Sequence, residues 1–134
     1  MKLLVCGDRG WTDKLFIRDF ILALNTYSSI DLIVEGGAVG ADTLAGKIAQ
    51  ELDISLTVYP AEWTKYGRSA GYVRNTQMLE EVEPDLVVAF HDSIGDSKGT
   101  AHCLREAKKR SIRAVLVTHR DNIIEIVKML RVET

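Results

Sequence analysis

Five short and mainly apolar runs, separated by segments with helical spacing, constrain the fold of this chain more than any other feature. Most of these runs lack polar alternation, which is typical of strands buried on both faces of a parallel sheet. Strands that alternate with helices predict an α/β fold, and five strands are too few for a (β/α)₈ barrel. We therefore expect a single-domain Rossmann-like three-layer fold over residues 1–134, with an open parallel sheet of about five strands. The expected strands are Leu3–Cys6, Leu32–Glu35, Ser55–Tyr59, Asp85–Phe90 and Ala114–Val117.

The order of the strands decides where a ligand can bind. In the order 3-2-1-4-5, the switch point lies between the first and fourth strands, and ligands bind beyond the C-terminal ends of strands at such a point. The loops 7–11 and 91–100 would meet there, with residues 36–42 beside them. These stretches are rich in glycine and polar residues, so they predict a ligand site at this edge. The residues expected at the centre of the sheet are Leu4, Val34, Val58, Val88 and Val117.

The stretch from Leu32 to Asp42 combines a strand, a Gly36-Gly37 turn and the start of a helical run at Gly40. Glycines let backbone N–H groups approach an anion closely, and a helix N-terminus adds unpaired N–H groups and partial positive charge. The stretch lacks the Lys-Ser/Thr that completes a Walker loop. It therefore predicts either a phosphate site or an ordinary tight turn that binds nothing.

Charge and cysteine content narrow the classes of function. The net charge is −2 and the pI is near 5.9, which argues against broad nucleic-acid binding but leaves room for one local basic site. Cys6 and Cys103 lie outside any CxxC motif, and two cysteines make no disulfide framework. No apolar stretch approaches the roughly 18 residues of a membrane span, and the N-terminus is too short for a signal peptide. These features predict a cytoplasmic protein with reduced thiols and no membrane contact.

Several polar motifs occur in order along the chain, from the end of the first strand to the helix after residue 70. The motifs are Gly7–Asp13, Gly36–Asp42, Tyr59–Trp63, Tyr66–Gly71 and Arg74–Leu79. Together they resemble the YspA/YpsA-like branch of the SLOG superfamily, which includes LOG phosphoribohydrolases and DprA-type DNA-processing proteins. The resemblance implies a Rossmann-like domain that binds a nucleotide or a nucleotide-derived signal, of bacterial or phage origin, in a family that commonly self-associates.

Two further matches concern the LOG enzymes, which cleave the N-glycosidic bond of nucleoside 5′-monophosphates. Residues 74–78 are similar to their Arg-Lys-x-x-Met motif, with Asn75 in place of Lys, and residues 95–100 look like a stretched Gly-Gly-x-Gly-Thr loop. The following Glu of that loop falls on Cys103, and Glu106 lies one helical turn further on. This departure argues against hydrolysis and leaves phosphate binding in place. If the chain is an enzyme, the catalytic candidates are Glu35, Glu106 and Arg74, with Asp8 and Asp42 as further carboxylates.

The candidate ligand-binding residues are glycines, cations and small polar residues at the expected C-terminal edge. Arg74 can pair with a phosphate or form a surface ion pair, and Asp42 can contact a ribose or only cap a helix. Trp11, Trp63 and Tyr66 can stack on a base, or they can seal the edge of the sheet or a subunit contact, and this second role is favoured for Trp63. The candidates are Gly7, Asp8, Arg9, Gly36, Gly37, Gly40, Asp42, Arg74, Asn75, Lys98, Gly99 and Thr100.

These observations lead to three alternatives for function. The first is a cytoplasmic module that binds a nucleotide or a nucleotide-derived signal, with an anion held between Gly36-Gly37 and Lys98-Gly99-Thr100. The second is a nucleoside 5′-monophosphate N-glycosidase, and the third is a DprA-like DNA-binding module. Because of the acidic pI, we expect a small-molecule nucleotide as the partner rather than nucleic acid. His91, His102 and Cys103 do not form a convincing ligand set, so neither a metal nor a cofactor is expected.

Overall fold

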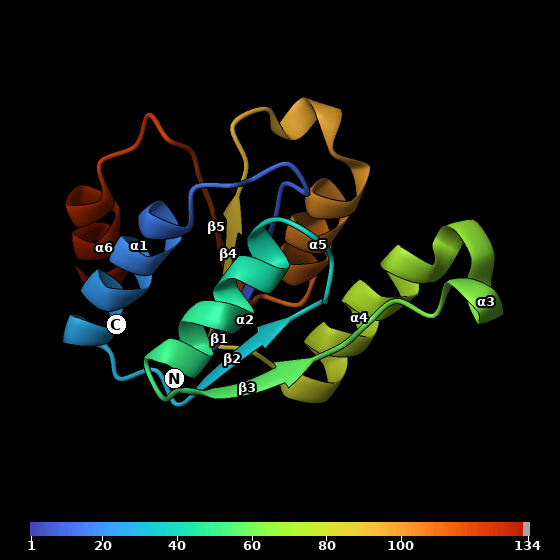
Figure 1. Ribbon diagram of the computed structural model, residues 1–134, viewed down its shortest axis with the longest axis horizontal. Helices are drawn as coiled ribbons and strands as arrows, with labels where there is room; N and C mark the ends of the chain where they lie inside the picture. Colours follow the sequence, from blue (N-terminus) through green and yellow to red (C-terminus); the bar gives the residue numbers. More distant parts are fainter. Residues whose placement is uncertain (133–134) are drawn as a thin grey trace.

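The computed structural model describes residues 1–132, and its five strands form one parallel sheet in the order β3-β2-β1-β4-β5 (Figure 1). The register places Leu4 of β1 beside Val34 of β2 and Val87 of β4. The predicted fold class is therefore confirmed, and the strand order is the one that places the switch point between the first and fourth strands. The strands are β1 (Lys2–Gly7), β2 (Leu32–Glu35), β3 (Ser55–Val58), β4 (Leu86–Phe90) and β5 (Arg113–Val117).

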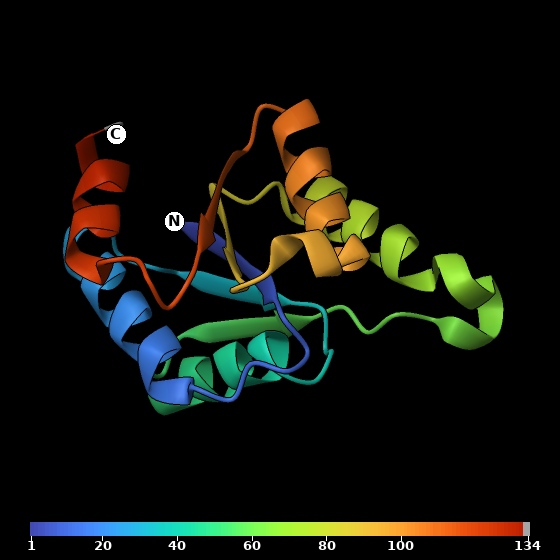
Figure 2. The same cartoon turned by 90° about the horizontal axis from the view of Figure 1, so that it is seen from above.

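Helices cover both faces of the sheet, and each face has its own apolar core (Figure 2). One face packs against α1 (Lys14–Tyr27), α2 (Ala41–Glu51) and α6 (Ile123–Val132). The other face packs against α4 (Ala70–Val82) and α5 (Lys98–Lys109). Side chains alternate between the two cores along each strand, which is why the central strands are apolar without polar gaps.

The edge strand β3 departs from the prediction for the centre of the sheet. Leu4, Val34, Val88 and Val117 are fully buried, but Val58 is exposed. Val58 is the last residue of the edge strand β3 and belongs to neither apolar core, whereas Val117, the last residue of the other edge strand β5, packs into the core beside α1, α2 and α6. The expected central position of Val58 is therefore wrong.

The connection between β3 and α4 forms an arm, defined here as residues 62–69. It contains the short helix α3 (Trp63–Tyr66) and the 3₁₀ turn η1 (Gly67–Ser69), where the sequence indicated only a polar and aromatic connection. Every residue of the arm is exposed, and α3 stands off from the body of the molecule in both views (Figures 1 and 2). A second 3₁₀ turn, η2 (Ile94–Asp96), leads into α5. Among the described residues, no helix is long and apolar enough to cross a membrane.

Candidate functional site

An open cleft of about 420 Å³ lies at the C-terminal edge of the sheet, at the switch point between β1 and β4. Its walls are the loop after β1, the arm with the first half of α4, and the turn that leads into α5. Ligand sites of open α/β sheets occupy this position. The polar and charged side chains of the lining are those of Asp8, Arg9, Asp42, Arg68, Arg74, Asn75, His91, Asp96, Ser97, Lys98 and Thr100.

The glycine turn after β2 does not offer free N–H groups to this cleft. Asp42 Oδ2 accepts hydrogen bonds from the N–H groups of Gly36 at 3.2 Å and Ala38 at 3.3 Å. The N–H group of Gly37 donates to the Glu35 carboxylate. The protein's own carboxylates therefore occupy the positions where a phosphate would bind, and the expected cradle at Gly36-Gly37 is filled from within.

These two carboxylates titrate at unusually high pH because they are buried. Desolvation raises the pKa of Glu35 to about 7, against the opposing effect of the Gly37 N–H group. Desolvation also raises the pKa of Asp42 to about 6, although the neighbouring Arg74 guanidinium and two backbone N–H groups lower it. Burial disfavours the charged form of both groups. The turn is thus held by carboxylates that sit close to their titration range at neutral pH.

Arg74 connects the glycine turn to the start of α5. Its Nη1 group donates to the Gly36 carbonyl, and its Nε group donates to Asn75 Oδ1 at 3.0 Å. Asn75 is buried and donates from Nδ2 to the Gly99 carbonyl at 3.2 Å. Arg74 therefore lines the cleft from a fixed position rather than forming the alternative surface ion pair.

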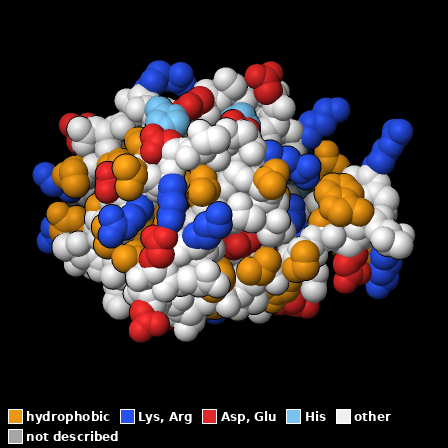
Figure 3. All heavy atoms as spheres, viewed as in Figure 1, with side chains coloured by type: hydrophobic (Ala, Val, Ile, Leu, Met, Phe, Trp, Pro, Cys, Tyr) orange, Lys and Arg blue, Asp and Glu red, His pale blue; other side chains and the backbone are white. Residues whose placement is uncertain are grey.

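Exposed cations and aromatic rings line the cleft from its different walls. Arg9 in the loop after β1, Arg68 on the arm and Lys98 at the start of α5 line the cleft with exposed side chains, and the Arg9 guanidinium lies 5.8 Å from the centre of the Trp63 ring. Trp63 is 50% exposed and Tyr72 is also exposed. At the right of Figure 3, hydrophobic side chains lie among Lys and Arg side chains. The cleft therefore combines exposed cations with exposed aromatic rings.

The structure brings most of the predicted ligand-binding residues together but leaves several outside the cleft lining. Gly36, Gly37 and Gly40 do not line it, and neither does Glu35 or Glu106. Gly40 has φ of +87° and its Cα hydrogens face the backbone of residues 8 and 9, so it serves close packing. Glu106 instead forms ion pairs with basic residues of its own helix. The predicted residues in the lining are Gly7, Asp8, Arg9, Asp42, Arg74, Asn75, Lys98, Gly99 and Thr100.

The structure separates two tryptophans for which the sequence left alternatives. Trp11 is almost fully buried in the core, so it cannot stack on a ligand base. Trp63, for which sealing the sheet edge or a subunit contact is favoured, is half exposed and lines the cleft. The residue type alone could not show which of these two tryptophans is buried and which is exposed. The difference comes from chain position, since Trp11 folds back onto β4 while Trp63 lies on the arm.

Arg68 and His91 line the cleft, although the sequence argument gave neither a ligand-binding role. The sequence feature that could have identified Arg68 is its position, since it follows the two aromatic residues of the arm and precedes the start of α4. The signal for His91 is that it directly follows β4, so it must lie at the C-terminal edge of the sheet. The prediction from the sequence covered His91 only as a possible metal ligand and gave it no role at the switch point.

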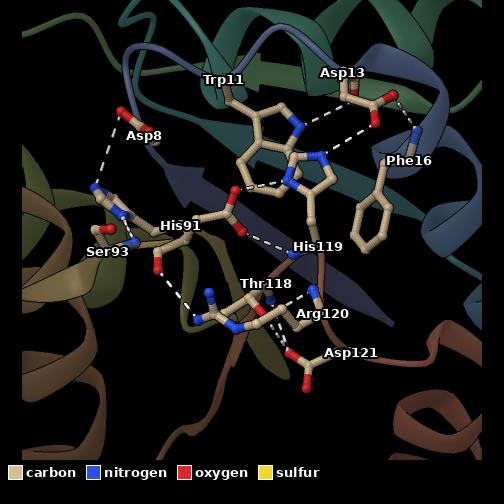
Figure 4. Close-up of polar contacts among 11 residues, drawn as sticks. Asp8, Trp11, Asp13, Phe16, His91, Ser93, Thr118, His119, Arg120 and Asp121 are labelled. Atoms are coloured by element: carbon tan, nitrogen blue, oxygen red, sulfur yellow. Dashed lines mark hydrogen bonds and ion pairs between the residues drawn. The ribbon is translucent and has the colours of Figure 1, made fainter.

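A second polar cluster lies at the same edge, around His119 in the loop after β5 (Figure 4). His119 Nδ1 is 2.7 Å from Asp92 Oδ2, and His119 Nε2 is 3.1 Å from Asp13 Oδ2. The imidazole stacks on Trp11 with ring centres 4.0 Å apart. The hydrogen bond to Asp92 is the main cause that raises the pKa of His119. This cluster ties three loops together, and its polar groups satisfy one another.

Comparisons with known proteins agree with this architecture. The family model for YspA, cpYpsA-related SLOG proteins matches residues 1–66. The gene 61 protein of Mycobacterium phage D29 is 32% identical over 122 residues, which cover 85% of this chain and 94% of the phage protein. This chain belongs to the YspA, cpYpsA-related SLOG family.

A solved structure extends the comparison of this SLOG-family chain to its full length. DNA processing protein A from Helicobacter pylori, described for its single-stranded DNA binding mode, matches with a TM-score of 0.62 and 16% identity. The match covers 99% of this chain and 81% of the Helicobacter chain. At this level of identity, the likeness establishes a shared Rossmann-like fold.

This comparison corrects two predictions made from the sequence. Binding of a nucleotide-derived signal was preferred and nucleic acid was not expected as a partner, but the full-length structural match is to a protein described as binding single-stranded DNA. The net charge of −2 is an average over the whole chain, and it does not reveal that four cations, together with three aspartates, line one cleft.

Proposed function

We propose that this protein binds single-stranded DNA in the cleft beside the arm. The observation that carries the proposal is the presence of exposed cations and exposed aromatic rings in the lining of one cleft. Proteins that bind single strands combine a positive groove for the phosphates with aromatic faces on which bases stack. The likeness to the Helicobacter DNA-binding protein supports the same choice.

Each part of the wall has a role in this proposal. Arg68 and Lys98 pair with phosphates, because both are exposed and stand on opposite sides of the opening. Trp63 and Tyr72 provide stacking faces, and a single strand fits them because its bases are free to unstack. Arg74 adds a cation that is already fixed by Gly36 and Asn75. A duplex keeps its bases stacked inside, so it can use only the charges.

The proposal also includes a place of action and an assembly. We place the protein in the cytoplasm of a bacterium or of a phage-infected cell, where single-stranded DNA occurs during replication and repair. The phage relative supports this origin. Self-association remains part of the proposal and can be measured by analytical ultracentrifugation with and without DNA.

Fluorescence anisotropy with a labelled oligothymidylate tests the proposal. We expect binding to the single strand to be stronger than to a duplex of equal length and to weaken as salt increases. Lys98→Ala should weaken binding and reduce the salt slope by about one, whereas Lys108→Ala, at the other end of α5, should change neither. Trp63→Ala should cost about 1–3 kcal/mol of binding free energy. Equal binding of single strand and duplex, or no binding, would contradict the proposal.

A further inference from the structure

His91 is a buried histidine that presents one polar atom to the cleft. Its side chain is 6% exposed, and it lines the cleft at the end of β4. The Ser93 N–H group donates to His91 Nδ1 at 2.9 Å, so Nδ1 carries no proton and Nε2 must carry one. Among the described residues, Nε2 has no hydrogen-bond partner, and Asp8 Oδ1 lies 4.0 Å away. His91 is therefore a neutral and rigid donor aimed into the cleft.

Asp8 places a fixed carboxylate beside this donor, as Figure 4 shows. Its backbone is held by hydrogen bonds to Phe90, Trp11 and Ala41. Its Oδ1 accepts the Gly10 N–H group at 2.8 Å, which fixes the side chain, while Oδ2 accepts no hydrogen bond from residues 1–132. A carboxylate repels phosphate, so its place in a DNA-binding cleft calls for a different partner.

Together, His91 Nε2–H and the Asp8 carboxylate offer one hydrogen-bond donor and two acceptor oxygens, which suit the flat, uncharged edge of a base. Bases of single strands are read by hydrogen bonds on their Watson–Crick edges. Guanine is the one DNA base whose Watson–Crick edge carries an acceptor, O6, next to two adjacent donors, N1–H and N2–H. Thymine offers one donor at N3, and cytosine and adenine each offer one amino group.

We propose that Asp8 and His91 form a base-reading pair that selects guanine within the bound single strand. His91 Nε2–H donates to O6, and the Asp8 carboxylate accepts N1–H and N2–H. Arg68 and Lys98, at the rim of the cleft, hold the phosphates on either side. This inference rests on the proposed DNA binding and adds a base preference to it.

The test compares an eight-residue oligothymidylate with the same strand carrying one central guanine, by fluorescence anisotropy. We expect the guanine strand to bind about tenfold more tightly, as for one well-made base contact. Inosine lacks the N2 amino group and should bind as thymine does. Asp8→Asn keeps an oxygen for the Gly10 N–H group but turns an amide donor toward the base, so it should abolish the preference for guanine.

Asp96→Asn is the matched control, because it removes an exposed carboxylate from the same cleft lining. It should leave the guanine preference intact, and thermal melting should show that both variants are folded. An unmodified protein that binds both strands equally, or an Asp8→Asn variant that still prefers guanine, would overturn the base-reading pair while leaving DNA binding standing. Failure to bind any strand would overturn the proposed function, and the base-reading pair with it.

Discussion

Two kinds of polar group lie side by side at the C-terminal edge of the sheet. In the closed part, formed by the glycine turn 36–40 and the His119 cluster, the hydrogen-bonding groups are paired with one another. In the open part, formed by the cleft lining, His91 Nε2 and Asp8 Oδ2 have no hydrogen-bond partner among the described residues, and the exposed side chains of Arg68 and Lys98 line the same cleft. Glycine and charge are present in both parts. We infer that the proposed ligand site differs from a structural site because its polar groups are not already satisfied.

A pair of glycine substitutions should give the largest difference between the closed and open parts. A Cβ on Gly40 would strike the backbone of residues 8 and 9, and its φ of +87° strains any other residue. We expect Gly40→Ala to lower the free energy of unfolding by about 3 kcal/mol. Gly99→Ala has open space around its Cβ and should change stability by less than about 1 kcal/mol. Urea denaturation measures the free energy of unfolding of both variants, and equal losses would contradict the distinction between the closed and open parts.

The next effect concerns the buried carboxylate of the closed part. The folded-state pKa of Glu35 is raised to about 7, so its contribution to stability is present at low pH and is lost as pH rises through 7. Glu35→Gln keeps an acceptor for the Gly37 N–H group but cannot ionise. We expect the variant to be more stable than the parent by about 2 kcal/mol at pH 8. Chemical denaturation at pH 5 should show a smaller gap, and a gap independent of pH would refute this account.

The smallest effect should come from His119, whose partners are partly exposed. Its folded-state pKa is raised, so its ion pairs stabilise the fold fully below the ordinary histidine pKa and lose this effect as pH rises through the raised value. His119→Gln should lower stability by up to about 1 kcal/mol at pH 6. Thermal melting at pH 9 should show parent and variant closer together. A difference in stability between parent and variant that grows with pH would contradict the stabilising effect assigned to charged His119.

The fold could be predicted from the sequence because strands buried in a parallel sheet can be recognised as uninterrupted apolar runs. The core residues Leu4, Val34 and Val88 follow from these apolar runs, whereas Val58 was wrongly placed at the centre of the sheet, because an apolar run does not show whether the end of a strand is covered. The position of the cleft was also predictable, since the loops of a switch point converge by topology.

The inner arrangement of the site was not predictable in the same way. That Asp42 and Glu35 fill the glycine turn depends on side-chain directions that no motif encodes. The proton on His91 Nε2 likewise depends on one backbone hydrogen bond, in which the Ser93 N–H group donates to Nδ1 and fixes the tautomer. Net charge likewise did not reveal the local arrangement, in which four cations and three aspartates line one cleft, because it sums charges over the whole chain.

Nuclear magnetic resonance tests the central claim most directly, because it reports every backbone amide during one titration with oligothymidylate. The account predicts shifts that change with DNA at residues 8–10, 63–75 and 97–100, around the open cleft. It predicts small changes at residues 118–121, around the closed His119 cluster. A titration in which the largest shifts lie on α1 and α6, or in which no amide responds, would contradict the claim that the open cleft binds single-stranded DNA.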